Sequence, residues 1–303
     1  MTTWSTDPPR DPLDAWFEQR FPFRRVLRAE IDADLRVRDR LPTDVADKSF
    51  LGDVVEHAIG LSLCDEPPYR HLLNCLNHHR AATLLRLAGY QARDAVTGTD
   101  LNAWCRSGAS PQPGRLFVAA HRLAHLRALL NPPWGAGRTD PDAIARLLQR
   151  HPDALHGDVT ETRHEWIAFS GLWNSYTAGF QAALVSFGTA TADVRLLDGH
   201  RRMDFVLGST VLELKSGRLD QESYLDHLIK QMITYALLAH REGYPITYVG
   251  FYAVRYQRLM RYPVQQLLDR LAGEHVNLIA TAAELAVVIL RQTPYGTGWR
   301  GAA

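Results

Sequence analysis

Hydrophobic residues recur at intervals of three and four positions through most of the first half of the chain. This spacing places apolar side chains on one face of a helix, and it is clearest in residues 53–63, 69–90 and 115–130. A stretch rich in proline and glycine, residues 131–142, then interrupts the pattern and is typical of a loop or a domain boundary. The pattern therefore predicts a mostly helical domain over residues 1–150.

The pattern changes after residue 158. A long amphipathic helix is predicted up to Gly188, followed by three short β-forming segments at 191–199, 200–208 and 209–217. Beyond them the pattern predicts a helix, a strand, a helix, a short strand and a last helix, at residues 219–242, 245–254, 263–272, 276–281 and 282–290. This order indicates an α/β domain over residues 158–303, with a mixed central sheet flanked by helices.

Composition narrows the class of protein. The chain has 303 residues, of which 46% are hydrophobic and 22% charged, so it can bury the core of one large or two ordinary domains. Because the formal net charge is only +1, any binding of a polyanion requires local positive charge. Three cysteines predict no disulfide framework and favour a reducing, cytoplasmic setting. The first residues lack the apolar core of a signal peptide, and the sequence predicts no membrane span.

The second and third β-forming segments carry the chemistry. If Gly208–Ser209 forms a type II′ turn, Asp204 falls directly opposite Glu213 in an antiparallel hairpin, and Lys215 points to the same face. Val206 and Val211 are predicted on that face, and Phe205, Leu212 and Leu214 on the other. Lys215 is one of only three lysines in a chain whose positive charge is otherwise arginine, which indicates a task specific to an ammonium group.

Two facing carboxylates repel each other unless a cation lies between them. Lys215 offsets part of this charge, and a hard divalent cation, Mg²⁺ or Mn²⁺, would offset the rest. The expected ligands are Asp204, Glu213 and the backbone carbonyl of Leu214. An alternative is a solvated face with ordinary salt bridges, which needs no metal.

Asp204 and the run Glu213-Leu214-Lys215, within the predicted order of elements, resemble the PD-(D/E)XK nuclease superfamily over residues 160–255. Gln231 and Tyr235, spaced as Q-x-x-x-Y, are similar to the RecB-like branch. The resemblance implies a restriction-endonuclease-like αβββαβ core and a Mg²⁺-dependent deoxyribonuclease with Asp204, Glu213 and Lys215 as catalytic residues.

The resemblance has two departures. Met203 stands where the superfamily often has proline. The three cysteines all precede residue 106, so the four-cysteine iron–sulfur cluster of some RecB-like nucleases is not expected.

Further site residues are suggested by position and by the resemblance. Glu165 lies on the apolar stripe of the helix before the hairpin, so it is predicted as a third metal ligand or a support for one, with Glu161 as the alternative. Gln231 and Tyr235 are expected to position the nucleic-acid strand. The expected phosphate contacts are Lys230, Arg218 and Arg241.

The helical half offers weaker signals. His121 and His125, one turn apart, form a possible two-ligand metal face, and Cys64 and Cys75 are expected to be core residues in preference to zinc ligands. This half is expected to bind DNA or a protein partner. DNA is the expected substrate, RNA is left open, and endonuclease and exonuclease action are not distinguished. Two other classes stay open: a catalytically inactive nuclease-fold module, and a helical partner-binding protein with an incidental hairpin.

Overall fold

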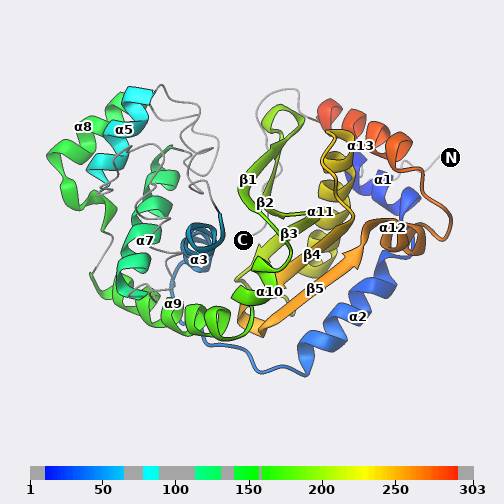
Figure 1. The fold of residues 1–303 in the computed structure, drawn as a ribbon, viewed down its shortest axis with the longest axis horizontal. Helices are drawn as coiled ribbons and strands as arrows, with labels where there is room; N and C mark the ends of the chain where they lie inside the picture. Colours follow the sequence, from blue (N-terminus) through cyan, green and yellow to red (C-terminus); the bar gives the residue numbers. More distant parts are fainter. Residues whose placement is uncertain (1–10, 65–77, 89–112, 131–139, 157–158, 293–303) are drawn as a thin grey trace, which may run out of the picture.

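A computed structural model describes residues 11–64, 78–88, 113–130, 140–156 and 159–292. The described chain is α/β, with one five-stranded mixed sheet, as the hydrophobic pattern predicts (Figure 1). The strands are β1 (Ala190–Leu196), β2 (Arg201–Leu207), β3 (Thr210–Lys215), β4 (Tyr248–Ala253) and β5 (Arg258–Pro263).

Helices cover the sheet and extend away from it. The α-helices are α1 (Pro12–Arg20), α2 (Arg24–Arg36), α3 (Lys48–Leu63), α5 (His78–Leu87), α7 (Pro113–Leu130), α8 (Pro141–Arg150), α9 (Val159–Gly179), α10 (Gln181–Val185), α11 (Glu222–Arg241), α12 (Val264–Ala272) and α13 (Leu278–Gln292). Short 3₁₀ turns are η1 (Pro152–Leu155), η2 (Leu197–Gly199) and η3 (Val254–Tyr256).

The strands lie side by side in the order β1-β2-β3-β4-β5. All neighbours are antiparallel except β3 and β4, which run parallel because α11 crosses over between them. The β2–β3 hairpin has the predicted register, with Leu207 opposite Thr210 and Phe205 opposite Leu212. Of the two turn residues, only Gly208 has a positive φ, 55°, as a type II′ turn requires.

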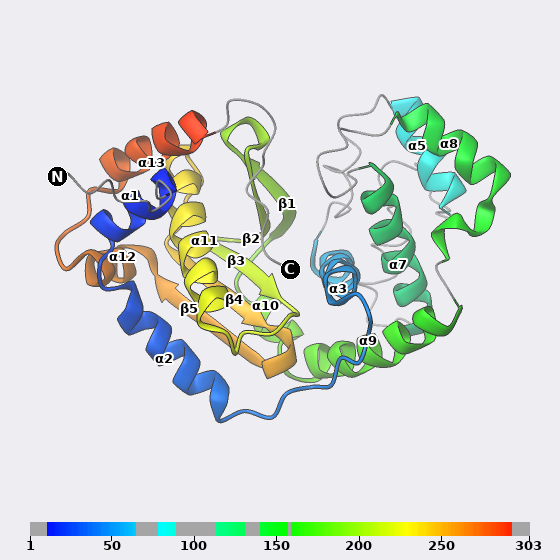
Figure 2. The same ribbon diagram turned by 180° about the vertical axis from the view of Figure 1, so that it is seen from behind.

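Two hydrophobic cores lie on opposite faces of the sheet, as the alternation along the hairpin predicts. The first core packs α3, α5, α7, α8 and α9 against Phe205, Leu212 and Leu214. The second packs α1, α2, α11, α12 and α13 against Val206 and Val211. Figure 2 shows the chain crossing from the second set of helices to the first between α2 and α3.

The two cores do not follow the predicted domain boundary near residues 150–158. Helices α1 and α2 come from the first half of the chain, yet Leu13 and Leu27 are buried with α11 and α13. Helix α9 comes from the second half, yet Phe169 is buried with α3 and α7. The two halves of the sequence therefore share both cores.

Two further boundary predictions differ from the structure. Residues 276–281, predicted as a strand, include the start of α13, because Asn277 caps that helix: its Oδ1 accepts the Ala280 N–H at 3.0 Å. The long helix predicted to reach Gly188 ends at Gly179, and α10 follows as a separate turn.

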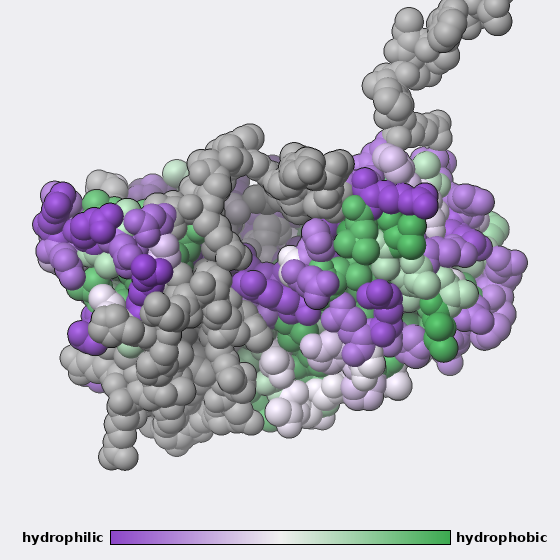
Figure 3. Space-filling model, turned by 90° about the horizontal axis from the view of Figure 1, so that it is seen from above, coloured by the Kyte–Doolittle hydropathy of each residue, from purple (hydrophilic) through white to green (hydrophobic). Residues whose placement is uncertain are grey.

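The described surface is largely hydrophilic when seen from above, with a hydrophobic patch on the right where α13 lies (Figure 3). Ile279, Val287 and Leu290 of α13 are exposed. Within the described ranges, none of the helices has both the length and the apolar composition needed to span a bilayer.

Candidate active site

A cavity of about 340 Å³ opens where β3 ends, between α3 and α11. Its walls come from four parts of the chain that are distant in sequence: α3, the β2–β3 hairpin, the loop after β3, and α11. The polar lining residues that matter for chemistry are Asp53, Glu56, Asp204, Lys215, Arg218 and His227. Leu214, predicted as a carbonyl ligand, also lines the cavity.

The hairpin brings Asp204 to this cavity by a change in its hydrogen bonding. Regular pairing of β2 with β3 extends from the turn to Phe205 and Leu212. One residue further, the carboxylate of Asp204 accepts the Leu214 N–H at 2.8 Å through Oδ2. This hydrogen bond holds Asp204 at the open end of the hairpin, where the residue is partly exposed and lines the cavity.

Glu213 and Lys215 form an ion pair at the end of β3. The Lys215 Nζ lies 2.7 Å from Glu213 Oε1. Glu213 is only 4% exposed, and its other oxygen, Oε2, has no hydrogen-bond partner among the described residues. A buried carboxylate oxygen without a donor is unfavourable, so this atom is suited to a further cationic ligand.

The charges in this cluster act on one another. Burial raises the pKa of Asp204, and the neighbouring carboxylates of Glu213 and Glu56 raise it further, well above its usual range. Burial lowers the pKa of Lys215, but Glu213 and Asp204 outweigh burial and raise it. Lys215 is therefore an ammonium ion at neutral pH, so it can donate hydrogen bonds and stabilise negative charge but cannot accept a proton.

Glu56 is the site residue that the sequence analysis missed. It comes from α3, and its carboxylate forms ion pairs with Arg202 and, at 3.6 Å, with Arg127. Although burial raises the pKa of Glu56, Arg202 and Arg127 outweigh it and lower the pKa to about 2. The signal was present in the sequence, because Glu56 interrupts an apolar run between Val55 and Ala58, which is the reasoning applied to Glu165.

The oxygen-rich lining fits a divalent metal ion. Asp204 lines the cavity, and Glu213 is hydrogen-bonded to Lys215, which also lines it. Both offer carboxylate oxygens, which hard cations prefer, and Glu213 Oε2 is buried with no donor among the described residues. In the described part of the chain, no three His, Cys, Asp or Glu side chains already converge as the ligands of one ion. Of the carboxylates near the cavity, Glu56 pairs with Arg202 and Glu213 pairs with Lys215.

Glu165 lies away from the cavity, so the prediction that it supports the metal site is wrong. Glu165 is buried on α9 as predicted, but its Oε2 lies 2.7 Å from Nε2 of His121 on α7, and this pair accounts for its burial. The alternative, Glu161, accepts the N–H of Ala46 at 2.8 Å. The acidic residue near the hairpin comes from α3 because α3 borders the cavity and α9 packs behind it.

Gln231 and Tyr235 lie together on the face of α11 that packs on the sheet, as their spacing predicts. They are 6% and 5% exposed, and the Gln231 Nε2 lies 3.5 Å from the Tyr235 hydroxyl. Burial raises the pKa of Tyr235 well above its usual range, and the charges of Glu213 and Asp204 raise it further. Neither side chain lines the cavity, and their contact with substrate stays a prediction.

The predicted phosphate contacts separate into different places. Lys230 lies between Asp14 and Asp226, at 2.8 and 2.7 Å, where it ties α11 to α1. Arg241 lies in the last turn of α11, at the opposite end of that helix from the cavity. Arg218 alone of the three lines the cavity.

The cysteine and histidine predictions are tested in part. Cys64 is a buried core residue, as expected. Cys75 lies outside the described residues. The rings of His121 and His125 lie 4.6 Å apart between centroids, so they do share a helix face. His121 uses that face to contact Glu165.

Comparisons with protein-family models, with curated proteins and with solved structures found no match to this chain. The site therefore has to be understood from its own geometry: Lys215, Asp204 and Glu56 line one cavity, and the buried carboxylate of Glu213 is hydrogen-bonded to Lys215.

Proposed function

We propose that this protein is a divalent-metal-dependent nuclease that hydrolyses phosphodiester bonds in DNA. The observation that carries the proposal is the set Asp204, Glu213 and Lys215 at one end of the hairpin, beside a cavity, with a buried carboxylate oxygen that lacks a donor among the described residues.

The fold supports the same proposal. Helix α9, strands β1 to β3, helix α11 and strand β4 follow one another in the αβββαβ order of the restriction-endonuclease-like core. We therefore propose that the chain belongs to the PD-(D/E)XK superfamily, with a RecB-like Gln231 and Tyr235 on the helix after the hairpin.

The metal would be held by Asp204 and Glu213, with the Leu214 carbonyl and Glu56 as further oxygen ligands. When bound, Mg²⁺ or Mn²⁺ would neutralise charge on the phosphate and lower the pKa of a water molecule. Glu56 pairs with Arg202, so it can bind the metal only if this ion pair breaks, and the proposal includes that change of partner.

Lys215 has a defined part in this chemistry. Its ammonium group donates to Glu213 Oε1 at 2.7 Å, and its side chain is 24% exposed toward the cavity. Its other two N–H groups can hold the attacking water by its oxygen and stabilise the negative charge that develops on the phosphate. Gln231 and Tyr235 would position the nucleic-acid strand, as in the RecB-like branch.

The direct experiment measures cleavage of linear, circular and single-stranded DNA with Mg²⁺ or Mn²⁺. We expect Asp204→Asn and Lys215→Ala to lower the rate at least about a hundredfold, the range that a positioned polar group contributes. Asp32→Asn is a matched control, because Asp32 pairs with Arg36 on α2, away from the cavity.

Two results would count against the proposal. Equal cleavage by wild type and both variants would place the active site elsewhere in the chain. Binding of DNA without cleavage on every substrate and with either metal would favour the catalytically inactive module.

A further inference from the structure

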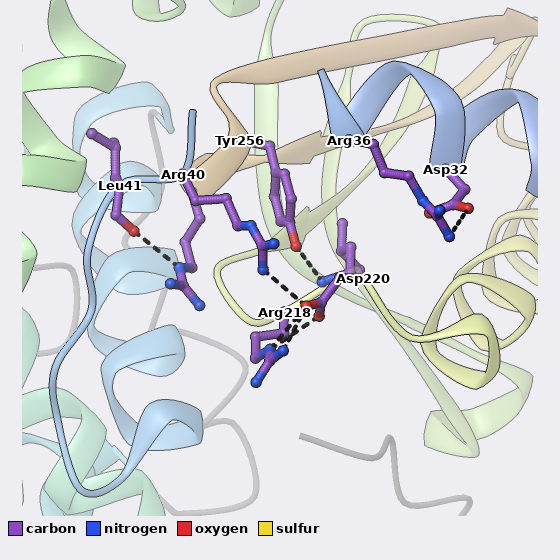
Figure 4. Close-up of polar contacts among 9 residues, drawn as sticks. Asp32, Arg36, Arg40, Leu41, Arg218, Asp220 and Tyr256 are labelled. Carbon is purple, nitrogen blue, oxygen red and sulfur yellow. Dashed lines mark hydrogen bonds and ion pairs between the residues drawn. The ribbon is translucent and has the colours of Figure 1, made fainter. Parts of the chain in front are cut away.

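Beside the cavity, two arginines from distant parts of the chain share one carboxylate. Arg218, in the loop after β3, contacts Asp220 through both ends of its guanidinium, Nε to Oδ1 at 3.0 Å and Nη2 to Oδ2 at 2.6 Å. Arg40, in the segment between α2 and α3, donates Nη1 to the same Oδ2 at 2.8 Å (Figure 4).

A third arginine joins this group from η3. The Arg255 Nε donates to the Leu41 carbonyl at 3.1 Å, and the Leu41 N–H donates to the Arg255 carbonyl at 2.9 Å. No described carboxylate forms an ion pair with Arg255. These two hydrogen bonds place Arg255 beside Leu41, the residue that follows Arg40. Burial lowers the pKa of Arg255, and the charges of Arg40 and Arg218 lower it further.

The charges in this cluster do not balance. Arg40, Arg218 and Arg255 carry three positive charges, and within the described ranges Asp220 is the one carboxylate that pairs with Arg40 and Arg218, while none pairs with Arg255. Arg40 and Arg218 are about half exposed, with side-chain exposures of 45% and 50%. Exposed guanidinium groups that carry more positive charge than the neighbouring carboxylates neutralise are well suited to bind a phosphate through paired N–H groups.

The sheet topology places this cluster next to the proposed active site. Strand β3 ends at Lys215 and the parallel strand β4 ends at its partner Ala253, so the segments that follow both strands leave from the same edge. Arg218 follows Lys215 by three residues, a chain length of at most about 10 Å. Arg255 follows Ala253 by two residues.

We propose that Arg40, Arg218 and Arg255 bind a backbone phosphate of the DNA strand that flanks the phosphodiester held at Lys215. The inference rests on the proposed function and deepens it, because it identifies the substrate as a strand that continues past the reacting phosphate. Asp220 holds the forks of Arg40 and Arg218 in place and leaves their outward N–H groups for the phosphate oxygens. Of these three arginines, only Arg218 is among the phosphate contacts predicted from the sequence.

A neighbouring ion pair in the same view gives the contrast. Arg36 pairs with Asp32 on α2 at 2.8 Å, one charge against one charge (Figure 4). Arg270 pairs in the same way with Glu30 at 2.7 Å. These arginines are exposed but balanced, so replacing them removes as much charge from the protein without removing the proposed phosphate site.

The test is DNA binding in EDTA, where cleavage cannot interfere, with a short fluorescein-labelled single-stranded DNA. The dissociation constant is measured by fluorescence anisotropy at several salt concentrations between about 50 and 200 mM. The variants are the double substitution Arg40→Gln/Arg218→Gln, the single substitution Arg218→Gln, and the control Arg36→Gln/Arg270→Gln, which removes the same charge as the first.

We expect Arg40→Gln/Arg218→Gln to weaken binding and to reduce the slope of log affinity against log salt by about 1, the effect of losing a phosphate contact. Arg218→Gln is expected to shift affinity in the same direction, and because it alters one exposed side chain it keeps the test valid if the double variant folds poorly. The control is expected to keep the wild-type slope.

The outcomes separate this inference from the proposed function. A wild-type salt slope in both Arg218 variants would overturn the inference, and cleavage by wild type would leave the proposed function standing. An equal loss of slope in the control would also overturn it, because general charge would then explain binding. A selective loss of slope in a protein that never cleaves DNA would support the phosphate site and refute the nuclease.

Discussion

Replacing Lys215 with alanine should lower the free energy of unfolding, measured without added metal, because it leaves the buried carboxylate of Glu213 without its cation. The Glu213 side chain is 5% exposed, and its Oε1 is held by Lys215 at 2.7 Å. Its Oε2 has no donor among the described residues, so the variant leaves a buried carboxylate with neither oxygen compensated. Breaking a buried pair from one side costs about 3–5 kcal/mol.

We expect the lower end of this range, about 3 kcal/mol, for Lys215→Ala, because the lysine side chain is itself 24% exposed. The double variant Lys215→Ala/Glu213→Gln should recover most of the loss, since a neutral amide leaves no buried charge. Lys230→Ala is the control, because Asp14 and Asp226, its partners, are 53% and 27% exposed. Its expected cost is about 1 kcal/mol or less.

The assay is urea unfolding in EDTA, followed by circular dichroism, with free energies from linear extrapolation. A loss below about 1 kcal/mol for Lys215→Ala, equal to that of Lys230→Ala, would refute the reasoning, because it would mean that solvent screens the Glu213 carboxylate. Failure of Glu213→Gln to restore stability would show that the ammonium group supports the fold by packing instead of by charge.

Two further predictions concern acid stability and the hairpin turn. Burial, together with His121 and His156, lowers the pKa of His125 to about 4, so between pH 6.5 and 4 the unfolded chain binds a proton that the folded chain excludes. The free energy of unfolding should therefore fall by about 1–2 kcal/mol as the pH drops over this range, after allowance for the partial exposure of the ring. His125→Gln should remove this loss, as measured by urea titrations at both pH values. Gly208→Ala should cost at least about 2 kcal/mol and impair cleavage, because Gly208 has φ 55° and its added Cβ would lie 2.2 Å from the Phe187 carbonyl oxygen. Gly171→Ala, on α9 with open space around it, should be neutral or stabilising, and equal thermal stability of the two variants would contradict the turn geometry.

The hairpin could be predicted from the sequence because its determinants are local. A glycine at the turn and strict alternation fix the register as far as Phe205 and Leu212. The predicted pairing of Asp204 with Glu213 is not part of this ladder, because the Asp204 carboxylate accepts the Leu214 N–H instead. The shared face of Gln231 and Tyr235 is likewise local, since it depends only on helical spacing.

Contacts between distant segments could not be predicted in this way. Two helices in the sequence carry a glutamate within an apolar stripe, Glu56 on α3 and Glu165 on α9, and periodicity alone does not say which helix borders the hairpin. The choice depends on packing: α3 forms a wall of the cavity, while Glu165 is hydrogen-bonded to His121, a residue 44 positions away.

Local exceptions explain the remaining errors in the fold. From the sequence, no strand is predicted at β5, whose residues RLMRYP lack regular alternation and end at Pro263. Pairing with β4 and the hydrogen bond from Arg261 to Thr210 stabilise it as an edge strand. Within the predicted strand 276–281, residues 278–281 are helical because Asn277 caps α13. Arg40 was missed because its partner, Asp220, lies 180 residues away.

The most direct test of the central claim is an anomalous difference map from crystals grown with MnCl₂. The account predicts a strong peak in the cavity, bonded to the carboxylates of Asp204 and Glu213, and Glu56 turned from Arg202 toward it. A map with no peak at the hairpin, in which Lys215 still holds Glu213 and Arg202 still holds Glu56, would contradict a metal-dependent active site at this position.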